Sequence, residues 1–153
     1  MAEVSIDLDM VRVSNEDFLK KAGDCAPQLK ETLVHPVEIV DIRETDGVYP
    51  EVLHRDSVDN MKNYHMKKGD KLCLDFGDHQ VGYVTLKLAS VGSPQDAPAF
   101  FKLKFGEIAK EMTEKSEEYD GWISRGWIQE EWFHIDVLPA TLVLPRRYAF
   151  RYL

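Results

Sequence analysis

The sequence predicts an all-β protein: an antiparallel β-sandwich of the jelly-roll or concanavalin-like kind, preceded by a short N-terminal helix. Two observations lead to this prediction. Apolar and polar residues alternate along several short segments, which is the pattern of half-buried strands. Turns that contain glycine or proline separate these segments at short intervals, as in sandwiches and barrels.

Residues 1–32 are expected to form a strand and a short helical segment ahead of the sandwich. Alternation over positions 1–13 predicts the strand. Ser14, followed three positions later by Asp17, forms an acidic version of the capping box and predicts the start of a helix. Residues 33–153 are then the sandwich domain, and we find no repeat or linker within them.

The segments with strand character share alternation and many β-branched or aromatic residues. An Asp-Phe-Gly turn is expected to separate the second of them from the third. Residues 51–68 are polar and ambiguous, and residues 107–120 are so rich in charge that an exposed loop is predicted. The predicted strands are 37–43, 71–76, 80–90, 99–107, 127–137, 141–145 and 147–153.

Composition and charge exclude several classes of protein. The chain has 153 residues, of which 44% are hydrophobic, and this is enough for one folded domain. The net charge of −8 argues against a nucleic-acid or anionic-membrane binder. Neither an apolar run of about 20 residues nor a signal-peptide pattern is present, so we expect a cytoplasmic protein. Cys25 and Cys73 have no zinc spacing, and a disulfide between them stays open.

Two pairs of acidic residues are candidates for hydrolytic chemistry. Asp75 and Asp78 flank the Phe-Gly turn, and two neighbouring carboxylates would suit glycoside hydrolysis. A short aspartate at a strand end more often caps a turn, so a structural role is favoured. Glu130 and Glu131 are neighbours on a predicted strand and therefore point to opposite faces.

The sequence assigns no metal ligand and no cofactor. His134 and Asp136 share one face of a predicted strand, but zinc needs three or four ligands. The acidic residues of 107–120 lack the spacing of an EF-hand, which leaves calcium open but without assigned ligands.

Trp122, Trp127 and Trp132 are the candidate carbohydrate-binding residues. Exposed indole rings stack on the C–H faces of sugars, whereas buried ones fill a core. The odd spacing between Trp127 and Trp132 puts them on opposite faces of a regular strand, so at least one is expected in the core. Trp122 lies between glycine and Ser-Arg-Gly and is the one most expected to be exposed.

Three motifs, in order, make the chain resemble bacterial α-L-rhamnosidases of glycoside hydrolase family 78. CLDFGDHQVGYVTLKL (73–88) resembles the family's Asp-Phe-Gly signature, which leads into a Gly-Trp or Gly-Tyr strand. FKLKFGE (101–107) and RRYAFRYL (146–153) are similar to two later strands. The sequence has Asp-His where the family commonly has Gln-Asn, which leaves the subfamily and substrate open. The matching residues are Asp75, Phe76, Gly77, Gly82, Tyr83, Gly106, Glu107, Arg151 and Tyr152.

The resemblance implies a non-catalytic accessory domain that supports a catalytic domain in the same polypeptide. In the family, an (α/α)₆ barrel that follows the sandwich carries the carboxylates of an inverting mechanism for terminal α-L-rhamnosides. We therefore expect the chain to be a fragment with that barrel beyond residue 153, and we assign no catalytic residue within it. The matching residues are expected to be architectural, with Gly82 permitting close backbone approach.

Two alternatives to the accessory role stay open. One is a stand-alone carbohydrate-binding module, and the other is a structural or self-association module without a ligand. The accessory role itself predicts an exposed apolar patch for docking of the barrel. Tyr148, Phe150 and Tyr152, which alternate along the last predicted strand, are expected at the edge of that patch.

Overall fold

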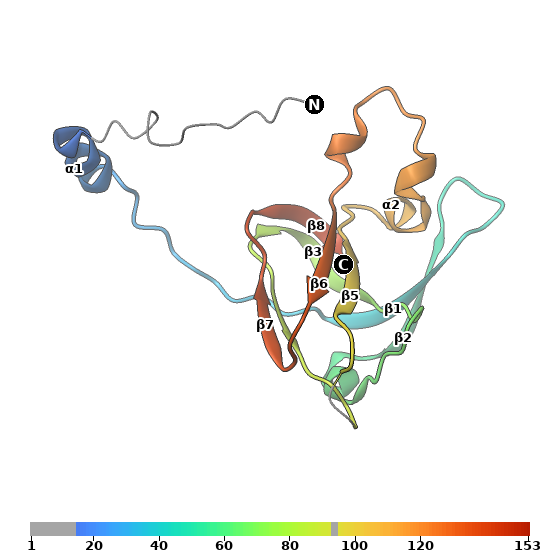
Figure 1. Ribbon diagram of the computed structural model, residues 1–153. Helices are drawn as coiled ribbons and strands as arrows, with labels where there is room; N and C mark the ends of the chain where they lie inside the picture. The colour runs from blue at the N-terminus through green and yellow to red at the C-terminus, as the bar shows by residue number, and fades with distance from the viewer. Residues whose placement is uncertain (1–14, 93–94) are drawn as a thin grey trace, which may run out of the picture. The chain divides into compact units, whose positions relative to one another are not determined.

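The computed structural model describes residues 15–92 and 95–153, which fall into two units divided between Leu33 and Val34. The first unit contains helix α1 (Glu16–Asp24) (Figure 1). Its N-cap is Asn15, whose side chain accepts a hydrogen bond from the Phe18 N–H at 3.2 Å. The cap is one position later than the sequence suggested. Ser14 and the strand predicted over 1–13 lie outside the described residues.

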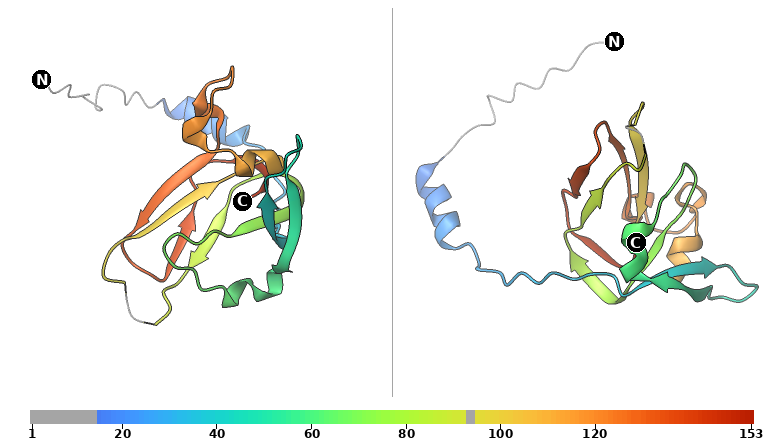
Figure 2. Two further views of the ribbon diagram at one scale, coloured as in Figure 1. Left: turned by 90° about the vertical axis from the view of Figure 1, so that its right-hand side faces the viewer. Right: turned by 90° about the horizontal axis from the view of Figure 1, so that it is seen from below.

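The second unit is an all-β sandwich in which every strand pairing is antiparallel (Figures 1 and 2). One layer is a four-stranded sheet in the order β2-β1-β3-β8, and two strand pairs, β4-β7 and β5-β6, lie across from it. The strands of the sheet are β1 (Glu38–Arg43), β2 (Glu51–Ser57), β3 (Cys73–Gly82) and β8 (Tyr148–Tyr152). The paired strands are β4 (Thr85–Leu88), β5 (Ala99–Lys104), β6 (Glu130–Ile135) and β7 (Ala140–Val143).

Two polar stretches turn out to be ordered. The ambiguous stretch 51–68 contains β2 and a 3₁₀ turn (Val58–Asn63), and β2 is polar because it lies at the edge of its sheet. The predicted loop 107–120 contains helix α2 (Ala109–Thr113) and a 3₁₀ turn (Ser116–Glu118), so that prediction was wrong. The Glu111 carboxylate caps α2 by accepting the Glu107 N–H at 2.6 Å.

The predicted Asp-Phe-Gly turn is instead an irregularity inside β3. Asp75 lies opposite Tyr152 and Gln80 lies opposite Phe150, so β3 carries extra residues between these two pairings. Gly77 has φ +78°, a conformation that favours glycine and is common at bulges. The chain therefore continues through the motif in one strand, and the long strand predicted over 80–90 is divided between β3 and β4.

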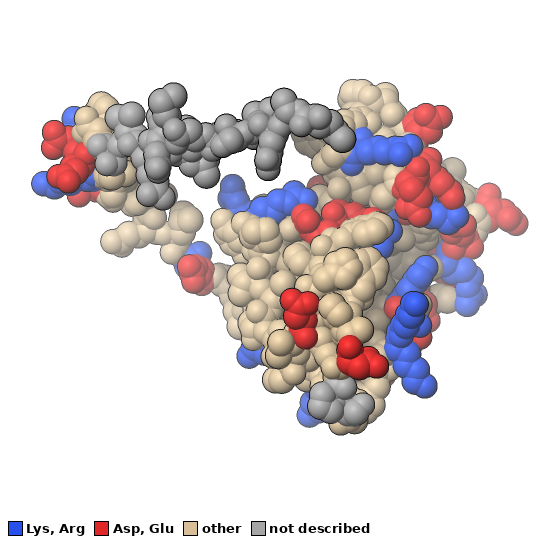
Figure 3. All heavy atoms as spheres, viewed as in Figure 1, with Lys and Arg blue, Asp and Glu red and all other residues tan. Residues whose placement is uncertain are grey.

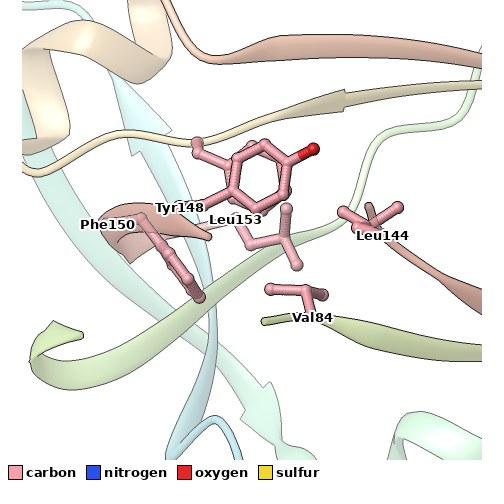
Figure 4. Close-up of a cluster of buried hydrophobic side chains, with 6 residues drawn as sticks. Val84, Leu144, Tyr148, Phe150 and Leu153 are labelled. Atoms are coloured by element: carbon pink, nitrogen blue, oxygen red, sulfur yellow. The ribbon is translucent and has the colours of Figure 1, made fainter. Parts of the chain in front are cut away.

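The core lies between the layers and is built around the aromatic residues of β8 (Figure 4). The Tyr148 ring is fully buried and stacks on Phe105, with ring centroids 4.1 Å apart. The Phe150 ring packs edge-on against Phe105 and Phe76, with ring centroids 5.3 Å and 5.0 Å apart, respectively. The alternation along β8 was predicted correctly. The prediction that Tyr148, Phe150 and Tyr152 lie at the edge of an exposed patch was wrong, because all three are buried.

The surface is unevenly charged. The face over β6 and β7 is largely uncharged, whereas acidic and basic groups gather around α2 and the β1–β2 hairpin (Figure 3). Among the described helices, none is long and apolar enough to cross a membrane.

Candidate functional site

An ion pair between Asp75 and Arg151 joins β3 to β8. Arg151 donates from Nε to Oδ1 at 2.9 Å and from a terminal nitrogen to Oδ2 at 2.8 Å, a bidentate geometry. Asp75 is only 5% exposed, and its Oδ1 also accepts the Gly77 N–H at 2.7 Å. Burial alone would raise the pKa of Asp75, but these donors outweigh burial and hold the pKa below its usual value. Asp75 is thus an ionised group that fastens two strands.

Gly106 lies beside the same pair of strands. Its N–H donates to the Tyr152 carbonyl at 3.0 Å, and its carbonyl accepts the N–H groups of Arg151 and Tyr152, both at 2.8 Å. A Cβ at Gly106 would lie 2.8 Å from the Sδ of Met112, a residue of α2. The glycine therefore lets α2 pack against the end of β5.

The other motif residues lie apart from this junction. Tyr83 is exposed, and a Cβ at Gly82 would meet no atom within 4 Å, so the expected close approach at Gly82 was wrong. Glu107 is exposed, with its carboxylate 3.8 Å from Nε2 of His79. Of the motif residues, the structure therefore brings together those at the β3–β8 junction: Asp75, Gly77, Gly106, Arg151 and Tyr152.

All three tryptophans are exposed. Trp122 is 96% exposed, as predicted, Trp127 is 74% exposed and Trp132 is 62% exposed. The prediction that at least one of them is in the core was wrong. It assumed one regular strand, whereas Trp127 lies in a 3₁₀ turn (Arg125–Trp127) before β6 begins.

Trp132 is part of an ordered aromatic cluster on the outer face of β5 and β6. Phe100 on β5 pairs directly with His134 on β6, and their ring centroids are 4.9 Å apart. The Phe100 ring meets Trp132 edge-on at 5.6 Å. Lys102, paired with Trp132 across the strands, places its Nζ 5.4 Å from the indole centroid. We call Phe100, Lys102, Trp132 and His134 the outer platform.

Glu130, on the same face of β6 as Trp132, holds the outer platform in place. Its Oε1 accepts the Trp132 indole N–H at 2.8 Å and lies 3.0 Å from the Lys102 Nζ, while its Oε2 accepts the Ser116 hydroxyl at 2.6 Å. Burial alone would raise the pKa of Glu130, but the hydrogen bonds from Ser116, Trp132 and Lys102 outweigh burial, and the pKa lies below its usual value. An ionised Glu130 therefore fixes the orientation of the indole ring.

Glu131 points to the opposite face, as predicted for neighbours on a strand. It accepts hydrogen bonds from Arg146 and from the Tyr148 hydroxyl, both at 2.9 Å. The two glutamates are therefore separated by the strand pair, and each has a structural partner.

Sequence reasoning missed Phe100, Lys102, Glu130 and His134 as members of a surface cluster. The signal was present in the alternation of 99–104 and 130–135, which puts these residues on one face. The alternation does not show how β5 and β6 are aligned, and this register decides which residues of the two strands lie side by side.

His134 and Asp136, the two residues that share a face of the strand predicted over 127–137, are not joined by further metal-ligating side chains within the described part of the chain. Among residues 15–92 and 95–153, no three His, Cys, Asp or Glu side chains are grouped so that they would hold a metal ion. The His134 ring packs on Phe100 instead.

Comparison with known proteins defines the class of this domain. The family model described as the glycosyl hydrolase family 78 alpha-rhamnosidase N-terminal domain matches residues 36–153, and the chain belongs to that family. A solved structure of a rhamnosidase from Klebsiella oxytoca with rhamnose bound is 36% identical, with a TM-score of 0.78. The match covers 90% of this chain and 27% of that one. No curated protein matches the chain.

Proposed function

We propose that this chain is the non-catalytic accessory sandwich of an α-L-rhamnosidase whose catalytic domain belongs to the same polypeptide. The whole enzyme hydrolyses terminal α-L-rhamnosides with inversion. The observation that carries the proposal is the family match over 36–153. The rhamnosidase of similar structure, of which this chain spans about a quarter, gives it further support.

The positions of the carboxylates support a non-catalytic role. Inverting hydrolysis needs an acid and a base on either side of the scissile bond, about 6.5–9.5 Å apart, with room for water. Both Asp75 oxygens are occupied by Arg151, and Asp78 hydrogen-bonds the N–H of His79. Glu130 and Glu131 point away from each other and hold structural partners.

The test compares this chain with the full-length polypeptide of its source. We expect the full-length protein to hydrolyse 4-nitrophenyl α-L-rhamnoside and this chain to leave it intact. Proton NMR of the first-formed sugar is expected to show the β-anomer, the product of inversion. Hydrolysis by this chain would contradict the accessory role, and an inactive full-length protein would contradict the enzymatic one.

Carbohydrate binding by this domain is the second candidate function. The exposure of all three tryptophans favours it, since an exposed indole ring can stack on the C–H face of a sugar. Titration with methyl α-L-rhamnoside is expected to change the tryptophan fluorescence in a saturable way. An unchanged spectrum at about 50 mM sugar, well above a millimolar Kd, would remove this candidate.

A further inference from the structure

The three exposed tryptophans differ in how firmly they are held. The Trp132 ring is fixed by its N–H bond to Glu130 and by the edge of Phe100. Among the described residues, no hydrogen bond involves the indole of Trp122 or Trp127. A fixed ring loses little side-chain entropy when a ligand stacks on it, so Trp132 is the pre-organised one of the three.

The surroundings of Trp132 also provide polar groups, of which the Lys102 Nζ lies 5.4 Å from the indole centroid. The Lys102 ammonium has three N–H donors, and its closest carboxylate partner is Glu130. The His134 ring lies against Phe100, with the ring centroids 4.9 Å apart, and its nitrogens can donate or accept. An aromatic surface with a few oriented polar groups is the composition of small-molecule sites.

We infer that the outer platform binds a single sugar ring, with Trp132 as the stacking surface. The negative face of the indole attracts the C–H groups of a pyranose ring, and a 6-deoxy sugar adds an apolar methyl group. Lys102 and His134 hydrogen-bond the hydroxyls at the rim of the ring. The inference rests on the carbohydrate-binding candidate above and is independent of whether the full-length protein hydrolyses rhamnosides.

The charge balance of the platform fits a neutral ligand. The Lys102 ammonium lies 3.0 Å from a Glu130 oxygen and 4.0 Å from a Glu117 oxygen, so its positive charge is balanced by neighbouring carboxylates while its N–H groups remain donors. An anionic ligand would meet the Glu117 and Glu130 carboxylates beside the single ammonium, which disfavours it relative to a neutral one.

The test follows each indole N–H separately by nitrogen–proton NMR of this chain. The three indole signals are assigned with Trp122→Phe, Trp127→Phe and Trp132→Phe variants. On titration with methyl α-L-rhamnoside, the Trp132 signal is expected to shift and saturate while the Trp122 signal stays in place. Trp132→Ala is expected to weaken binding by about tenfold or more, whereas Tyr49→Ala, at an exposed aromatic residue between β1 and β2, leaves it unchanged.

Each other outcome has a distinct meaning. A saturable shift at Trp122 or Trp127 without one at Trp132 would overturn this inference and leave carbohydrate binding standing. No shift at any indole up to about 50 mM would overturn both. If Trp132 responds in this chain but not in the full-length protein, the platform is a surface on which another domain docks, and the inference fails.

Discussion

Ion pairs in this domain differ sharply in what surrounds them. Arg43 and Glu51 are both well exposed, with their charged atoms 4.0 Å apart, and such pairs contribute little to stability. Asp75 is buried, and Arg151 donates a hydrogen bond to each of its carboxylate oxygens. The stability lost when one residue of an ion pair is replaced therefore depends on how deeply its partner is buried.

Arg151→Met is expected to destabilise the domain by about 2 kcal/mol, since it leaves the buried Asp75 carboxylate with the Gly77 N–H as its remaining partner. Arg43→Met is the matched control, and it is expected to cost less than about 1 kcal/mol. Urea unfolding at neutral pH measures both. If both variants lost the same free energy of unfolding, the burial of Asp75 would not explain the effect of Arg151→Met.

The same pair predicts a dependence on pH. Because the pKa of Asp75 is lower in the folded chain than its unfolded value of about 3.9, the stabilisation is complete above about pH 5. It is lost as the pH falls through the folded pKa. The stability gap between the wild type and Arg151→Met should therefore be constant from about pH 5 to 8 and close below about pH 4. A gap that widens in acid would contradict this assignment.

The two cysteines are free and differ in reactivity. Burial, together with the charges of Asp75 and Asp41, raises the pKa of Cys73 to about 12, and thiolates are the reactive form. Cys25 is exposed. A disulfide-exchange reagent at about pH 8 is expected to modify Cys25 alone in the native chain and both thiols in denaturant. Rapid modification of native Cys25→Ser would show that Cys73 is accessible.

At the scale of the element, β3 depends on one glycine. A Cβ at Gly77 would lie 3.2 Å from a Val37 methyl group, and φ is +78° there. Gly77→Ala is expected to cost about 1–2 kcal/mol. Gly82→Ala, in the same strand with open space around it, is the control and is expected to change little. Equal chemical-denaturation midpoints for the two variants would contradict the role of the bulge.

The alternation of apolar and polar residues predicted most strands, because one face of each strand is buried and the other is exposed to solvent. It failed where other forces decide. β2 is an edge strand with charged side chains on both faces, so no apolar period marks it. The acidic segment before β6 folds into α2 because the Glu111 carboxylate caps the helix end, which net charge alone does not reveal.

The candidate site was predicted only in part. The exposure of Trp122 was predicted correctly from its place between a glycine and a Ser-Arg-Gly stretch, which is typical of a loop. Trp132 was not ranked first, because its environment depends on Lys102 and Phe100 from a strand about thirty residues earlier. Sequence spacing reports which face a residue occupies, and the register between strands decides what lies beside it.

At the scale of the whole molecule, Phe150 on β8 packs against Phe76 of its own sheet and connects that sheet to the other layer through Phe105, which follows β5. Phe150→Ala is expected to cost about 3–5 kcal/mol, a large share of the stability of a domain. Phe100→Ala, at a half-exposed ring on the outer face, is the control and should cost about 1 kcal/mol. Thermal unfolding followed by circular dichroism compares them. Similar losses would contradict the central place of Phe150.

The pairing of β8 with β3 has a consequence for biosynthesis. Leu74 and Leu153 exchange two backbone hydrogen bonds across a long stretch of chain, and the core is incomplete until β8 arrives. A ribosome takes on the order of ten seconds to make the residues from β3 to β8, during which the apolar face of β3 has no partner from β8. The nascent domain is therefore a natural client for chaperones over that interval, and slow decoding between β3 and β8 should lower its soluble yield.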